Sequence, residues 1–177
     1  RVLEFTHAVL GPSCGLILSD LGAEVIRVEP PDGDPTRKLK GFGMGYFPFF
    51  NRNKKSIAVN LKDERGLEVI YKLLDSTDVL IENFRPGAME SWGLGPEVLQ
   101  ELNPGLIMLR ISGYGQTGPY KDKPGFGVVA EAMGGMRHLS GEPGRLPVRV
   151  GISIGDTLAS LHGVIGILMA LHEKQKS

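Results

Sequence analysis

Residues 2–29 read VLEFTHAVLGPSCGLILSDLGAEVIRVE, and this stretch decides the fold. Val2–Phe5 is a short apolar run typical of a strand, and a helical stretch follows at 13–21 with Gly22 as its C-cap. Residues 23–29 then alternate apolar and polar side chains as a strand does, before two prolines. The stretch therefore predicts a β-α-β unit.

The same alternation continues along the chain. Apolar runs predict strands at 57–61, 79–81 and 106–111, and helical periodicity predicts helices at 63–74 and 96–102. Strands that alternate with helices indicate the α/β class, with a doubly wound, Rossmann-like and mostly parallel sheet between flanking helices.

The remaining segments are less regular. Residues 31–50 are rich in glycine, proline and aromatic residues, which favours a long loop. A short helix is expected at 128–133, where Gly134 and Gly135 break it, and a loop at 141–147. From Leu158 onward, apolar residues at 161, 164, 165, 168 and 171 form a stripe typical of a helix.

Composition limits the function classes. The 177 residues are enough for one domain with a core, and 20 basic against 20 acidic side chains give no broad electrostatic footprint for nucleic acid or an anionic membrane. No apolar run approaches the ~20 residues needed to span a bilayer. The one basic cluster, residues 52–55, is interpreted as a solvated turn rather than a phosphate contact. The single cysteine, Cys14, fits a reducing compartment and is expected to be a buried structural thiol.

Ligands of doubly wound sheets bind beyond the carboxyl ends of the strands. The segments expected there are 7–11, 83–87 and 112–115, which are polar, aromatic or glycine-rich. His7 ends a strand, and its ring is more often held by a local backbone hydrogen bond than used in a site.

Several common chemistries are disfavoured. Glu29 ends the second strand as a ribose-binding acid would, but residues 11–15 lack the glycine fingerprint of dinucleotide folds, so NAD binding is not expected. The four histidines have no metal-ligand spacing, and no zinc site is expected. Ser112 and Ser153 do not lie in a nucleophile elbow.

Asp156 begins an apolar helix after Gly155 and has two interpretations. An aspartate there is most simply an N-cap, which satisfies free amides and the helix dipole. The same amides would lower its pKa and keep it ionised, and an ionised carboxylate in a water-excluding site is a usable nucleophile. Capping and nucleophilic roles are therefore compatible.

The ordered motifs along the whole chain resemble the N-terminal region of the family III CoA-transferases, the CaiB/BaiF family, which includes formyl-CoA transferase and carnitine CoA-transferase. The motifs that carry the resemblance are residues 2–7 with Gly11-Pro12, 20–29, 33–37, 51–56, 82–87, 113–119 and Gly155-Asp156.

The resemblance implies that Asp156 is the catalytic residue and carries acyl and CoA groups covalently. It also implies that coenzyme A and acyl-CoA are substrates, with no permanently bound cofactor, and that a small carboxylic acid accepts the CoA. The residues matching CoA-contacting stretches of the family are Val9, Leu10, Val59, Asn60, Leu61, Lys62, Asn83, Phe84 and Arg85.

Two departures bear on the substrate and reaction. Formyl-CoA transferase has glutamine at the position of Val9, which argues against formyl-CoA and oxalate here. The related α-methylacyl-CoA racemases pair the aspartate with a histidine in the stretch corresponding to 125–127, where this chain has Phe126, so a two-base racemase would lack one base. Transfer is favoured over racemisation; a CoA-binding fragment in which Asp156 only caps its helix is the non-enzyme alternative.

The resemblance further implies that 1–177 is the N-terminal part of a CoA-binding large domain and that the full-length protein is an interlocked homodimer. Both ends of the chain are interpreted as cuts through a longer protein. No nucleic acid or membrane partner is expected, and the expected compartment is the cytoplasm, or the mitochondrion in a eukaryote.

Overall fold

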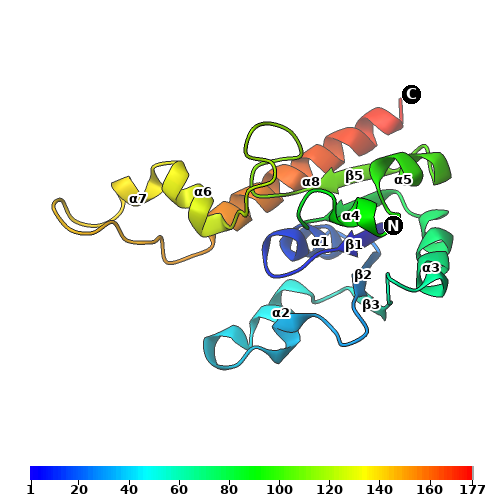
Figure 1. Ribbon diagram of the computed structural model, residues 1–177, viewed down its shortest axis with the longest axis horizontal. Coiled ribbons are helices and arrows are strands. Elements are labelled where there is room, and N and C mark those ends of the chain that lie inside the picture. The colour runs from blue at the N-terminus through cyan, green and yellow to red at the C-terminus, as the bar shows by residue number, and fades with distance from the viewer. Residues whose placement is uncertain (177) are drawn as a thin grey trace.

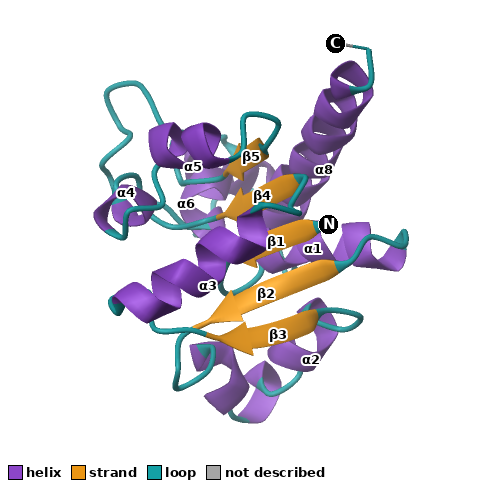
Figure 2. Cartoon of the chain, turned by 90° about the vertical axis from the view of Figure 1, so that its right-hand side faces the viewer, coloured by secondary structure: helices purple, strands orange, loops and turns teal. Residues whose placement is uncertain are grey.

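The structure is a computed structural model that describes residues 1–176. Its centre is a five-stranded, wholly parallel sheet in the order β3-β2-β1-β4-β5, and Figure 2 shows the five arrows pointing the same way. The strands are β1 (Val2–Phe5), β2 (Val25–Glu29), β3 (Lys55–Ala58), β4 (Val79–Glu82) and β5 (Ile107–Arg110). The predicted doubly wound α/β fold is confirmed.

Helices cover both faces of the sheet. The longer elements are α1 (Leu10–Asp20), α3 (Glu64–Leu74), α5 (Pro96–Leu102), α6 (Gly127–Met133) and α8 (Ile154–Lys174). The shorter ones are η1 (Pro35–Lys38), η2 (Gly41–Gly43), α2 (Tyr46–Phe50), α4 (Ala88–Ser91) and α7 (Met136–Leu139).

Side chains along the strands point alternately to the two faces of the sheet, and they form one hydrophobic core on each face. Leu3 and Leu80 face the layer that contains α3 and α5, and pack with Leu74. Val2 and Val79 face the opposite layer, where α1 and α8 lie, together with the residues Cys14, Leu18, Val164 and Ile167. Because side chains in a strand point alternately to opposite faces, nearly continuous apolar strands are what a sheet buried on both sides requires.

Several predicted boundaries were wrong by a few residues. Helix α1 begins at Leu10 instead of residue 13, because the first turn of a helix needs no amide from Pro12. Its C-cap is Leu21, and Gly22 follows with φ of +98°. Strand β3 begins at Lys55 instead of residue 57, because its register with β2 pairs Lys55 with Ile26. This edge strand carries polar residues that apolar patterning cannot detect.

The segment 31–50 is not the long loop that its composition suggested, since it contains η1, η2 and α2. The Asp34 carboxylate caps η1 by accepting a hydrogen bond from the backbone N–H of Thr36. The Arg37 guanidinium lies 3.7 Å from the ring centre of Phe47. Local capping and a cation–π contact thus organise a segment that has no hydrophobic period.

A buried ionic cluster fixes this segment to the sheet. Glu4 of β1 lies beside Arg27 of β2, with Oε1 2.8 Å from Nη1, and Lys54 Nζ lies 2.9 Å from Glu4 Oε2. Arg27 also pairs with Asp34. The side chains of Glu4, Arg27 and Lys54 are at most 1% exposed. The interpretation of residues 52–55 as a solvated turn is therefore wrong for Lys54, although Lys55 is exposed.

The second half of the chain extends beyond the sheet. Figure 1 shows α6, α7 and the segment leading to α8 projecting away from the strands, and α8 returning along them. Helix α8 is long and apolar enough to cross a membrane by length and composition, with a mean hydropathy of 1.6, and 22% of its most apolar stretch is buried. The expectation that no apolar run approaches the length of a membrane span is wrong for this helix by these two criteria. Helix α8 buries Ser160, Gly163, Val164 and Ile167, and two of these, Val164 and Ile167, belong to the core on this face of the sheet.

Candidate active site

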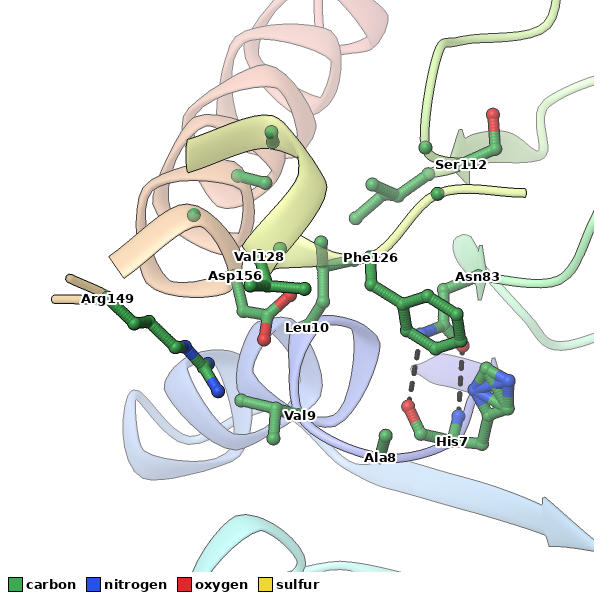
Figure 3. A pocket seen from close by; sticks show the side chains of 17 residues that line it. His7, Ala8, Val9, Leu10, Asn83, Ser112, Phe126, Val128, Arg149 and Asp156 are labelled. Atoms are coloured by element: carbon green, nitrogen blue, oxygen red, sulfur yellow. Dashed lines mark hydrogen bonds between the residues drawn. The ribbon is translucent and has the colours of Figure 1, made fainter. Parts of the chain in front are cut away.

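A pocket of about 370 Å³ opens at the carboxyl edge of the sheet, where the segments after β1, β4 and β5 meet the starts of α6 and α8 (Figure 3). Each of the three predicted wall segments contributes to it, which confirms their placement at one edge. The lining residues are His7, Ala8, Val9, Leu10, Asn83, Ile111, Ser112, Gly113, Gly125, Phe126, Gly127, Val128, Ala130, Arg149, Gly155, Asp156 and Ala159.

Asp156 lies in the first turn of α8 and lines the pocket. It is not the N-cap: that residue is Ser153, which makes no side-chain cap hydrogen bond. Within residues 1–176 the Asp156 carboxylate has no hydrogen bond and no ion pair. The simple capping interpretation is therefore wrong, and the carboxylate faces the pocket (Figure 3).

The electrostatics of Asp156 also differ from the expectation. Burial raises the pKa of this carboxyl, the charge of Arg149 lowers it, and the charge of Glu131 raises it, with burial the largest effect. The net pKa lies above the ordinary value for aspartate, whereas we expected the helix amides to lower it. Removal from water disfavours the charged form more than the first turn of α8 favours it. A carboxylate without hydrogen bonds is less stabilised and therefore more nucleophilic.

Glycines allow the starts of α6 and α8 to approach closely. A Cβ built on Gly127 would lie 3.0 Å from Asp156 Oδ1, and one on Gly155 would lie 3.2 Å from the carbonyl oxygen of Gly127. Upstream, a Cβ on Gly125 would lie 2.4 Å from the Cα of Gly113. The loop after β5 therefore packs directly on the segment that leads into α6. These contacts explain the glycines on both sides of Phe126.

His7 and Asn83 form the opposite wall. The Asn83 side chain accepts a hydrogen bond from the His7 N–H at 2.9 Å and donates one to the His7 carbonyl at 3.0 Å (Figure 3). The His7 ring stacks edge-on against Phe84 at 5.5 Å. Burial lowers the pKa of His7, Asp34 raises it and Arg27 lowers it, which favours a neutral imidazole at neutral pH. The ring has no hydrogen bond within residues 1–176 and lines the pocket, contrary to the favoured interpretation.

Other candidate groups are occupied or inert. Glu29 accepts hydrogen bonds from Arg37 and Ser56, so it is not free to bind a ribose. Cys14 is fully buried, and burial followed by the charge of Glu4 raises the pKa of its thiol to about 12. In residues 1–176, no group of three or more His, Cys, Asp or Glu side chains is arranged to hold a metal ion.

The structure brings only some of the predicted CoA-contacting residues to the pocket. Val9, Leu10 and Asn83 line it together with Asp156. Phe84 lies behind the wall, between His7 and Trp92. Residues 59–62 follow the edge strand β3 and lie outside the pocket, as does Arg85.

Two charged residues of the site had no signal in the sequence. Arg149 lies in the irregular segment between α7 and α8 and lines the pocket, and its Nε lies 4.0 Å from Oε2 of Glu131 in α6. Single charged residues in glycine- and proline-rich surroundings resemble ordinary solvated positions. Only the packing of α6 against α8 places them beside Asp156.

Comparisons with known proteins agree with this geometry. The profile of the family described as CoA-transferase family III matches residues 1–177. Succinyl-CoA–D-citramalate CoA-transferase of Chloroflexus aurantiacus is 52% identical over 183 residues, which cover 100% of this chain and 45% of that protein. The alpha subunit of succinyl-CoA–L-malate CoA-transferase from Chloroflexus aurantiacus is 45% identical, covering 100% and 43%.

The fold has close matches among solved structures. A CAIB/BAIF family protein from Brucella suis superposes with a TM-score of 0.94 at 39% sequence identity, over 99% of this chain and 48% of that one. The chain thus spans about half the length of the relatives that it matches.

Proposed function

The chain belongs to CoA-transferase family III, whose profile matches residues 1–177, and from this premise we propose that the protein transfers coenzyme A from an acyl-CoA to a small carboxylic acid. The observation that carries the proposal is the Asp156 carboxylate, which faces a pocket at the sheet edge without hydrogen bonds or ion pairs in residues 1–176. The names of both Chloroflexus relatives state the same class of reaction.

The first half-reaction loads CoA onto the enzyme. An oxygen of the Asp156 carboxylate attacks the thioester carbonyl of the donor, the C–S bond breaks, and the CoA thiolate leaves with the electron pair. The product is a mixed anhydride of Asp156 and the donor acyl group. The thiolate then attacks the aspartyl carbonyl, which releases the donor as its carboxylate and leaves an aspartyl-CoA thioester.

The second half-reaction reverses these steps with the acceptor. The acceptor carboxylate attacks the aspartyl thioester, expels the CoA thiolate and forms a new anhydride. Attack of the thiolate on the acceptor carbonyl gives the product acyl-CoA and frees Asp156. The thioester energy stays on the enzyme as long as water is excluded, and the apolar side chains of Val9 and Leu10 in the pocket wall support this.

We place coenzyme A along the carboxyl edge of the sheet. Its adenine end would contact residues 59–62 after β3, its thioester end would lie at Val9 and Leu10, and Asn83–Arg85 would contact it after β4. Strands β3 and β1 are separated by β2 alone, so the two strands are about 10 Å apart, and an extended ligand along this edge could reach the segments that follow both. No permanently bound cofactor enters the proposed reaction.

The proposal also includes the oligomeric state of the full-length protein. We expect the full-length protein to form an interlocked homodimer, and the exposed apolar side chains of α8, such as Ile165 and Met169, offer contact surface for it. Light scattering of the full-length protein measures the mass directly, and a monomer at micromolar concentration contradicts this part.

The covalent step can be tested on the full-length protein. Incubation with an acyl-CoA, followed by hydroxylamine, should convert Asp156 to its hydroxamate, located by peptide mass spectrometry. Asp156→Asn should abolish the label and the turnover, whereas the exposed loop residue in Asp122→Asn provides a matched control that keeps both. Turnover that proceeds while Asp156 stays unmodified would refute the covalent mechanism.

An incubation of the full-length protein with an acyl-CoA and a second acid in deuterated water separates transfer from racemisation. Phe126 stands where a racemase needs a second base, and it is 73% exposed at the pocket. Transfer moves CoA to a second acid, whereas racemisation carries solvent deuterium to the α-carbon without acyl exchange. Deuterium incorporation without a new acyl-CoA would favour the racemase.

A further inference from the structure

Among the described residues that line the pocket containing Asp156, Arg149 is the one arginine or lysine. It projects from the segment before α8 toward the side of the pocket that holds Asp156 (Figure 3). Its side chain is 53% exposed, and within residues 1–176 its guanidinium makes no hydrogen bond. Its N–H donors are therefore available to a ligand. A planar guanidinium binds a carboxylate through two parallel hydrogen bonds.

Glu131 is the second unexplained group. Its side chain is 1% exposed, and neither carboxylate oxygen has a hydrogen-bond partner within residues 1–176. Burial of an unpaired carboxylate is costly, so such a group is unusual in a folded protein. The Arg149 Nε, 4.0 Å from Glu131 Oε2, is its one ion-pair partner in the described chain.

Glu131 and Asp156 carry negative charges, and Arg149 carries the positive charge that can pair with either of them. Glu131 is fixed on α6 and Asp156 on α8, whereas Arg149 comes from a segment without regular structure. Arg149 is ion-paired with Glu131 and not with Asp156. The charge of Arg149 also acts on Asp156. Without the charge of Glu131, the guanidinium would pair with the Asp156 carboxylate and occupy the nucleophile.

We propose that Arg149 binds the free carboxylate of a substrate acyl group that carries a second carboxylate, and that buried Glu131 holds Arg149 in place and away from Asp156. The substrate class is then the monothioester of a dicarboxylic acid, together with the free diacid. Arg149 is a binding residue that determines specificity, and Glu131 is a positioning residue. This inference rests on the proposed function.

The test compares two donors with the full-length protein. Succinyl-CoA carries a terminal carboxylate, and butyryl-CoA carries a methyl group at that place. The second-order rate constant of Asp156 acylation is measured with each donor by quenched mass spectrometry, and the ratio of the two constants is the readout. The wild-type ratio should favour succinyl-CoA, and Arg149→Gln should reduce it at least about tenfold. Arg149→Lys should fall between, because an ammonium keeps the charge without the planar fork.

Glu131→Gln provides a readout that a purely structural role would not give. Freed from Glu131, Arg149 pairs with Asp156, so acylation by butyryl-CoA should slow about tenfold although this donor has no carboxylate. In the double variant Glu131→Gln/Arg149→Gln the blocking cation is gone, and butyryl-CoA should react faster than in Glu131→Gln alone. A structural defect at Glu131 would not be rescued by a second substitution.

The chain contains a matched control pair. Arg145 and Glu142 are ion-paired at 3.0 Å in the same segment, are largely exposed and do not line the pocket. Arg145→Gln and Glu142→Gln should leave the donor ratio within about twofold of the wild type, since exposed pairs contribute little.

The outcomes separate the two proposals. If the wild type acylates Asp156 with neither donor, the proposed function fails. If it acylates Asp156 but shows no preference for succinyl-CoA, or if Arg149→Gln leaves the preference unchanged, the assignment of Arg149 is overturned. If the double variant stays as slow as Glu131→Gln, the positioning role of Glu131 is overturned.

Discussion

The carboxylate of Asp156 rests against the backbone of Gly127. A Cβ on Gly127 would lie 3.0 Å from Oδ1, 3.2 Å from Cγ and 3.3 Å from Oδ2 of Asp156, closer than most side chains approach one another. The glycine therefore makes room for the Asp156 carboxylate between the first turns of α6 and α8, and the orientation of the carboxylate depends on that space.

Gly127→Ala should impair catalysis without unfolding the protein. The new methyl group would displace the Asp156 carboxylate by a few tenths of an ångström, and small misplacements of reacting groups have large effects on rate. We expect kcat to fall about tenfold or more while the far-ultraviolet spectrum is unchanged. Stopped-flow measurement of acylation gives the rate.

Gly151→Ala is the control for this change. A Cβ on Gly151 has no atom within 4 Å, and the residue lies just ahead of α8 with an ordinary φ. Its kcat should stay within about twofold of the wild type. Equal losses in both variants would show that the Gly127 effect does not come from contact with Asp156.

Asp156→Asn should remove activity and stabilise the fold at neutral pH. Loss of the nucleophile is expected to cost about three orders of magnitude in kcat or more. The pKa of Asp156 is raised in the folded state, chiefly by burial, so its ionised form disfavours folding. The neutral amide lacks this cost, and thermal unfolding near pH 7 should give a higher Tm.

The difference in Tm between Asp156→Asn and the wild type should decrease as the pH falls. A group with a raised folded pKa contributes stability that is fully present below its unfolded pKa, about 3.9 for aspartate, and is lost as the pH rises through the folded value. The Tm advantage of Asp156→Asn should therefore disappear at about pH 3. An advantage that is constant with pH would contradict the raised pKa.

The pH dependence of the acylation rate is a second test of the raised pKa of Asp156. Only the ionised form attacks the thioester, so the rate should fall as the pH decreases through the raised pKa of Asp156, at a higher pH than an ordinary aspartate gives. Arg149 lowers this pKa and Glu131 raises it. Arg149→Gln should therefore move the acid limb to higher pH, and Glu131→Gln to lower pH.

The buried ionic cluster predicts a sharp contrast between two neighbouring lysines. Lys54→Met leaves Glu4 buried without one of its partners, and breaking such a pair costs about 3–5 kcal/mol. The side chain of Lys55 is 70% exposed and pairs with Glu24 at the surface, so Lys55→Met should cost about 0–1 kcal/mol. Urea unfolding of the two variants measures both values, and similar costs would exclude a role of Lys54 in holding 31–54 on the sheet.

Two glycines of α8 should respond to alanine with opposite signs. A Cβ on Gly163 would lie 2.8 Å from Leu109 Cδ2 and 3.3 Å from Cys14 Sγ, so Gly163→Ala should destabilise by about 1–3 kcal/mol. A Cβ on Gly166 meets nothing within 4 Å, and Gly166→Ala should stabilise the helix by about 0.5–1 kcal/mol. Thermal unfolding of both variants checks the signs.

Much of the fold was predictable because its strands are short, apolar and buried. Val2–Phe5 and Pro96–Leu102 have the predicted bounds, and the parallel order of strands follows from their alternation with helices. The structure of segment 31–50 and the bounds of strand β3 were mispredicted. Their structure depends on buried ion pairs and an edge register, which apolar periodicity does not record.

The site was predictable only in part. Segments that follow neighbouring parallel strands must meet at one edge of the sheet. The sequence alone therefore places His7, Asn83 and Ser112 together. The raised pKa of Asp156 could not, because it depends on burial by elements far away in the sequence.

By itself, the sequence determined the sheet, the edge at which the pocket opens and the identity of the candidate nucleophile. These follow from local periodicity, from strand order and from ordered motifs. Only the tertiary structure decided that Asp156 is no cap, that Gly127 makes room for it, and that Glu131 and Arg149 stand beside it. The reason is physical: the charge state and free hydrogen-bonding capacity of a side chain are set by the groups packed around it, and α6 meets α8 only in the folded chain.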